Sequence, residues 1–184
     1  MPWYRTAGKL TNPLTDEKFA EAMARGHFAE RKHMGFVALL YYSAVRKSEA
    51  LKATKEQFTI EGDELFFNVG KRLKHSQDTP SLNIPLKAPY VNEIIWSIQN
   101  TLPGERVWPY GKRTGYNIVH RVLPAYPHYF RLSRITNFFL KGWTIAQVRS
   151  WTGLSLKALD YYVGMVDVRK MGRSMLPEKS TQND

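Results

Sequence analysis

The sequence predicts one mainly helical domain that also contains a small three-stranded antiparallel sheet. The chain has 184 residues, of which 43% are hydrophobic and 13% aromatic, which is sufficient to fold around a single core. Most segments have the length and apolar spacing of helices, whereas residues 58–86 form short runs rich in strand-forming residues. No internal repeat divides the chain. These observations favour an α+β fold with a helical majority.

The N-terminal part predicts two helices followed by a break. Thr15 can cap the first helix, two acidic residues fall in its first turn, and the helix should end near Gly26. A second helix is expected over 28–42. Arg46 then lies at a break, and another helical stretch is predicted over 48–53.

The sheet is predicted from three short segments, 58–60, 64–69 and 81–86. The acidic, glycine-containing residues 61–63 favour a turn between the first two segments. The connection between the second and third segments, 70–78, is rich in lysine and arginine. The pattern therefore predicts an antiparallel sheet with a basic connection.

The remainder is predicted to be helical over 91–100, 115–122, 128–140, 144–151 and 156–163. Residues 1–13 are polar and turn-rich, which predicts an N-terminal arm. Residues 167–184 are polar and predict a flexible C-terminal tail. The domain itself is expected to span 14–166.

The charge of the chain favours a polyanionic partner. It carries 27 Lys and Arg against 16 Asp and Glu, a formal net charge of +11. Nucleic acid is the first candidate for such a basic domain. A solubilising surface, or binding to ribosomes or to a membrane surface, is the alternative.

Several classes of site are excluded or disfavoured. The absence of cysteine excludes disulfides, thiolate metal sites and cysteine nucleophiles. The five histidines form no metal-like pair with nearby carboxylates, and no glycine-rich phosphate loop precedes a helix. No apolar run is long enough to span a bilayer, and the first residues show no signal-peptide core. We therefore expect no metal, no cofactor, no membrane partner and a cytoplasmic location.

Four residues in order along the chain have the chemistry of a metal-free attack on a phosphodiester: Arg46, Lys71, Arg131 and Tyr162. Arginine suits the phosphate because its planar fork donates paired hydrogen bonds and stays charged. A lysine can protonate the leaving oxygen, and a phenol can attack. Each residue alone also has an ordinary explanation, as a surface cation, a solvated loop residue or a core tyrosine.

The segment that begins at Pro127 strengthens this pattern. His128 and Arg131 are three residues apart and share one face of the predicted helix. They also fall in its first turn, where backbone N–H groups and the helix dipole favour an anion. An ordinary helix start with a satisfied histidine is the alternative.

Taken together, these segments resemble the catalytic domain of the tyrosine recombinases. Residues 42–51 around Arg46 are similar to the family's first arginine box. Lys71 follows 71 − 46 = 25 residues later, in a Gly-Lys turn before a strand, as in the family's hairpin. Residues 128–131 resemble its His-x-x-Arg box, and residues 158–162 resemble the segment of the attacking tyrosine.

The resemblance implies the fold, the reaction and the site of that family. Tyr162 would attack a DNA phosphate and form a 3′-phosphotyrosine, with Tyr161 as its packed neighbour. Arg46 and Arg131 would hold the phosphate, while Lys71 and His128 would serve proton transfer. Double-stranded DNA would be the partner, a tetramer would assemble on paired sites, and a prokaryotic or viral origin is expected.

Three departures from the family pattern leave alternatives open. Leu154 stands where the family usually has histidine or tryptophan, and the following segment is one residue shorter, which keeps Tyr161 as an alternative nucleophile. No segment resembles the family's N-terminal DNA-clamping domain, so a catalytic fragment and a minimal protein both fit. A type IB topoisomerase-like enzyme, a catalytically inactive DNA-binding relative and a basic RNA-binding or ribosomal protein are the rival functions.

Overall fold

The computed structural model describes residues 13–70, 81–123 and 127–163. The described helices and strands are α1 (Asp16–Arg25), α2 (Arg31–Ser43), α3 (Lys47–Ala50), the 3-10 turn η1 (Lys55–Gln57), β1 (Phe58–Glu61), β2 (Glu64–Asn68), β3 (Ser81–Pro85), α4 (Val91–Gln99), α5 (Lys112–Val122), α6 (Pro127–Leu140), α7 (Ile145–Thr152) and α8 (Leu156–Val163). The predicted fold class is confirmed, and the predicted boundaries lie within three residues of these.

Two predicted segments lie outside the part of the chain that the structure describes. The arm predicted over 1–13 falls almost entirely on residues 1–12, and the tail predicted over 167–184 falls within 164–184. Both stay predictions. None of the described helices is long and apolar enough to cross a membrane.

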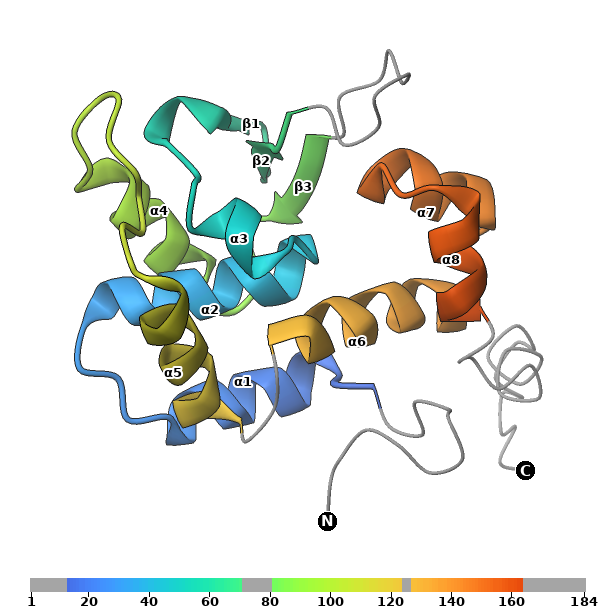
Figure 1. Cartoon of the computed structure of the whole chain (residues 1–184), viewed down its shortest axis with the longest axis horizontal. Coiled ribbons are helices and arrows are strands. Elements are labelled where there is room, and N and C mark those ends of the chain that lie inside the picture. The colour runs from blue at the N-terminus through green and yellow to red at the C-terminus, as the bar shows by residue number, and fades with distance from the viewer. Residues whose placement is uncertain (1–12, 71–80, 124–126, 164–184) are drawn as a thin grey trace, which may run out of the picture.

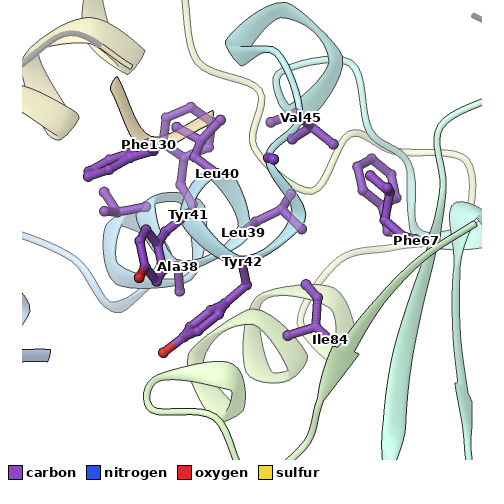
Figure 2. Close-up of a cluster of buried hydrophobic side chains, with 14 of the residues drawn as sticks. Ala38, Leu39, Leu40, Tyr41, Tyr42, Val45, Phe67, Ile84 and Phe130 are labelled. Atoms are coloured by element: carbon purple, nitrogen blue, oxygen red, sulfur yellow. The ribbon is translucent and has the colours of Figure 1, made fainter. Parts of the chain in front are cut away.

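Helix α2 is the centre of the molecule, with α4, α6 and the sheet around it (Figure 1). Its residues from 35 to 43 are all buried, because this segment is apolar on every side. Figure 2 shows side chains of α2 with Phe67 and Ile84 from the sheet and Phe130 from α6. The core therefore joins the first arginine segment, which follows α2, to the helix that carries Arg131.

The contact between α2 and α4 depends on Gly35. A Cβ atom at this position would lie 2.5 Å from the carbonyl oxygen of Glu93 and 2.6 Å from the hydroxyl of Ser97. Both distances are far below van der Waals contact. A glycine at this position of α2 therefore lets the two helices approach closely.

The sheet is antiparallel, in the order β1-β2-β3, which makes β3 an edge strand. Phe58 pairs with Phe67 across β1 and β2, and Leu65 pairs with Ile84 across β2 and β3. Leu82 and Ile84 are fully buried, whereas Asn83 between them is only partly buried. Because side chains alternate along a strand, Asn83 projects from the face opposite to the core. Helix α7 lies beside this edge strand (Figure 1).

Candidate active site

Arg46 is placed by the sharp turn at the end of α2. Ala44 adopts a left-handed conformation with φ of 50°, which ends the helix, and Arg46 becomes the N-cap of α3. The backbone N–H of Arg46 donates to Oε2 of Glu49 at 2.7 Å, and its guanidinium donates to Oε1 at 3.1 Å. The arginine side chain is nevertheless 55% exposed, so it can also reach an external ligand.

Arg131 lies in α6 and is almost completely buried, with 2% of its surface exposed. Its Nη1 donates to the carbonyl oxygen of Ala44, and its Nε donates to the hydroxyl of Tyr162 at 3.3 Å. Its Nη2 is buried and has no hydrogen-bond partner within the described residues. A buried charged donor without an acceptor is costly, which indicates a place for an anion.

A pocket of about 240 Å³ connects the two arginine segments. The residues that line it are Val45, Arg46, Lys47, Pro127, His128 and Arg131. The structure therefore brings together three of the predicted site residues that are widely separated in the sequence. The pocket lies at the start of α6, where free backbone N–H groups and the helix dipole add to the positive charge.

His128 lines this pocket and keeps part of its surface exposed. Partial burial of its ring lowers the pKa of His128 below the ordinary value of 6.5, and the charges of Arg131 and Arg46 lower it further. The neutral imidazole is therefore favoured near neutral pH. Its ring centroid lies 6.5 Å from that of Tyr162, which places a proton-exchanging group near the phenol.

Tyr162 reaches the site from α8, which packs against α6 and α7. It is 5% exposed, and its hydroxyl accepts the hydrogen bond from Arg131. The expectation that Tyr161 is the packed neighbour is wrong, because Tyr161 is 50% exposed. The buried face of α8 contains Leu159 and Tyr162, three residues apart, and Tyr161 falls off this face.

Lys71, the predicted proton donor, lies outside the described residues, as does the rest of segment 71–80. The strands on either side are described, and Asn68 pairs with Ser81 at the end of the hairpin. Leu154, the residue that departs from the histidine or tryptophan usual in the resembled family, is 5% exposed and packs into the core.

Lys47 is a pocket residue that the sequence analysis missed. It lines the pocket, and its Nζ donates to the carbonyl oxygen of Lys112 at 2.9 Å. Its ammonium also lies over the ring of Tyr116, 5.7 Å from the centroid. The available signal was its position directly after Arg46 in the sequence; in the structure it is the first residue of α3. Among the described residues, no group of three or more metal-ligating side chains comes together.

The fold matches those of solved recombinases and integrases. The XerH site-specific recombinase bound to palindromic difH substrate, in a post-cleavage complex, gives a TM-score of 0.63 at 15% identity, over 86% of this chain and 50% of that one. The chain has the fold of a tyrosine recombinase catalytic domain. It spans about half the length of that XerH chain.

Two further solved structures share this recombinase fold. The Tn1549 transposon integrase, residues 82–397, in complex with circular intermediate DNA gives a TM-score of 0.59 at 16% identity, over 90% of this chain and 65% of that one. The integrase from mycobacterium phage Brujita gives a TM-score of 0.55 at 11% identity, over 94% of this chain and 66% of that one. Neither a protein-family model nor a curated protein matches the sequence.

Proposed function

We propose that this chain cuts and rejoins DNA in site-specific recombination or integration, with residues 14–166 as the catalytic domain. The observation that carries the proposal is the environment of Arg131. One guanidinium donates to the hydroxyl of Tyr162, lines a cationic pocket and keeps a buried N–H group unpaired among the described residues. A phosphodiester in this pocket would satisfy that donor next to the phenol.

The proposed reaction proceeds by attack of the Tyr162 oxygen on the phosphorus atom. A bond forms between phosphorus and the tyrosine oxygen, and the bond from phosphorus to the 5′ oxygen breaks. Arg46 and Arg131 bind the non-bridging oxygens and stabilise the charge that develops on them. The phosphotyrosine conserves the bond energy, so a 5′ hydroxyl can later attack it and restore the strand.

Two further groups transfer protons in this proposal. Lys71 protonates the departing 5′ oxygen, and His128, which favours its neutral form, accepts the proton of the phenol or orients the phosphate. Neither a metal ion nor a nucleotide takes part. The balance of the reaction requires only the phenol, the phosphodiester and these proton carriers.

The DNA complexes among the similar structures support DNA as the substrate. The XerH recombinase was solved with its difH substrate in a post-cleavage and a pre-cleavage complex, and the Tn1549 integrase with circular intermediate DNA. By analogy we propose that this chain acts on double-stranded DNA in the cytoplasm of a prokaryotic cell. We also propose that four copies assemble on paired sites, which light scattering of the DNA complex would test.

A nicked suicide substrate tests the nucleophile. The unaltered protein is expected to form a covalent DNA adduct, and Tyr162→Phe is expected to abolish it, because only the attacking oxygen has been removed. Tyr161→Phe is the matched control and is expected to retain the adduct. Peptide mapping that places DNA on Tyr161 would reverse the assignment, and binding without any adduct would favour a catalytically inactive DNA-binding protein.

A further inference from the structure

A chain of hydrogen bonds connects the sheet to the helices that follow α6. The indole N–H of Trp151 in α7 donates to Oδ1 of Asn83 in β3 at 2.6 Å. The amide Nδ2 of Asn83 donates in turn to Oε1 of Glu64 in β2 at 2.8 Å. An indole only donates and a carboxylate only accepts, so the amide of Asn83 fits between them in one orientation. Asn83 therefore matches both neighbours, because its amide accepts from Trp151 and donates to Glu64.

The position of Trp151 makes this connection relevant to the site. Its ring also packs edge-on against Phe138 of α6, with centroids 4.7 Å apart. Helix α7 thus contacts β3, α6 and α8, and α8 carries Tyr162. The sheet on the other side holds both ends of the connection that contains Lys71. The hydrogen bond therefore joins α7, the neighbour of the helix that carries the proposed nucleophile, to the sheet whose strands β2 and β3 flank the segment of the proposed acid in the sequence.

We propose that Trp151 is a positioning residue, which fixes the α7–α8 pair against the sheet and so sets the placement of Tyr162. This inference rests on the proposed function. Trp151 touches neither the pocket nor the Tyr162 hydroxyl in the described contacts, so it acts through the geometry of α7 and α8. A displacement of the phenol by a fraction of an ångström lowers the rate of attack without weakening the phosphate contacts.

Trp151→Phe tests the connection, because phenylalanine keeps an aromatic ring against Phe138 and removes the N–H donor. The variant is expected to form the covalent adduct about 3- to 10-fold more slowly, the scale of one neutral hydrogen bond, with unchanged affinity for DNA. Trp143→Phe is the matched control. Trp143 also stacks on Phe138, at 4.4 Å, but its indole donates no hydrogen bond within the described residues. It should cleave at the rate of the unaltered protein.

Asn83→Leu provides the second arm of the test. It removes the acceptor of Trp151, so it should slow adduct formation as much as Trp151→Phe, and the double variant should be no slower than the slower single variant. If the rate reductions of the two single variants multiply in the double variant, the two side chains act independently and the proposed role of their hydrogen bond is overturned. Equal rates for Trp151→Phe and Trp143→Phe, or a loss of DNA affinity that accounts for the whole defect, would overturn it as well.

Amide hydrogen exchange tests the positioning role of Trp151 independently of the proposed DNA cleavage. In the DNA-free protein, Trp151→Phe should increase exchange of the amides of α8, and Trp143→Phe should not. This measurement requires no cleavage. A lack of adduct in the unaltered protein would therefore overturn the function alone, whereas unchanged exchange in α8 would overturn the positioning role.

Discussion

The two candidate phosphate ligands, Arg46 and Arg131, differ in their surroundings. Arg46 is half exposed and bound to Glu49, an arrangement that in an exposed ion pair contributes only about 0.2–1 kcal/mol to stability. Arg131 is buried and joins the Ala44 carbonyl to the Tyr162 hydroxyl. In the proposed reaction Arg46 can exchange Glu49 for a DNA phosphate, whereas Arg131 is already held by two hydrogen bonds. Their replacements should therefore have different effects.

Replacement by lysine separates the roles of these arginines. Arg131→Lys should slow adduct formation by about 10²–10³-fold, the scale of one lost charge-stabilising donor. It should also lower the melting temperature, because one ammonium cannot replace a planar guanidinium that donates to both the Ala44 carbonyl and the Tyr162 hydroxyl. Arg46→Lys should slow the reaction with little change in melting temperature. Rates and calorimetry measure both effects. If Arg46→Lys cleaves normally but melts earlier, Arg46 has only the structural role of pairing with Glu49.

DNA binding should change the protonation of His128. Burial and the two guanidiniums hold its pKa below 6.5 in the free protein, and a bound phosphate would offset the guanidinium charges and raise it. DNA binding slightly below pH 6.5 should therefore take up a proton, measurable by calorimetry in buffers of different ionisation enthalpy. His128→Gln should lose this uptake. His33, whose pKa burial also lowers, lies near the other end of α2, and His33→Gln should retain it.

The same lowered pKa values affect stability. As pH falls through 6.5, the unfolded state protonates before the folded state, so each of these histidines destabilises the folded protein as the pH falls towards its folded-state pKa. Denaturant unfolding at several pH values should show a stability that rises with pH in this window. A curve that is flat there in the unaltered protein would contradict the neutral state of both rings.

At the level of elements, the sequence predicted the helices and strands well because their ends carry local signals. Thr15 caps α1, and Gly153 adopts a left-handed conformation at the end of α7. The 3-10 turn η1 was not predicted, since it is a single short turn. Contacts between segments that are distant in the sequence could not be predicted from it either. The Trp151–Asn83 hydrogen bond and the burial of Tyr162 rather than Tyr161 depend on how α7 and α8 pack, which no local pattern specifies.

In the candidate site, too, residues within recognisable local segments were predicted, whereas contacts between distant segments were not. Arg46, His128 and Arg131 were predicted and line one pocket, because each belongs to a short segment with its own recognisable pattern. Lys47 was missed, since a lysine next to an arginine is common on protein surfaces. The acceptor role of the Ala44 carbonyl could not be predicted, because a backbone group carries no sequence signal.

Alanine should have opposite effects on stability at Gly35, where α2 packs against α4, and at Gly115 in α5. In Gly35→Ala the new methyl group would meet the backbone of α4, so the variant should lose about 1–3 kcal/mol of unfolding free energy. In Gly115→Ala the methyl group would lie 3.3 Å from a terminal methyl group of Leu51 and 3.4 Å from the ring of Phe36, so these side-chain ends need to shift by only a few tenths of an ångström, and alanine favours the helix. That variant should be neutral or more stable. Denaturant unfolding of both measures the difference, and equal losses would contradict it.

At the scale of the whole molecule, the net charge of +11 should govern DNA affinity. Binding to duplex DNA should weaken with salt, with a log–log slope of about −0.9 for each phosphate contacted. Arg46→Gln should reduce the slope by about one such contact. Lys141→Gln, just beyond the other end of α6, removes the same charge and should leave the slope unchanged. Fluorescence anisotropy measures both, and a flat salt response would contradict a phosphate-binding surface.

The Nη2 of Arg131, which has no hydrogen-bond partner in the part of the chain that the structure describes, also has a consequence for engineering. A protein that keeps a buried donor ready for a ligand gives up stability in the ligand-free state. Selection of variants for heat resistance alone would favour substitutions that supply an internal acceptor to this guanidinium. Such variants would fill the place that we propose for the DNA phosphate. A thermostable form of this chain should therefore be selected with an oxyanion or DNA present, so that stability and the phosphate site are kept together.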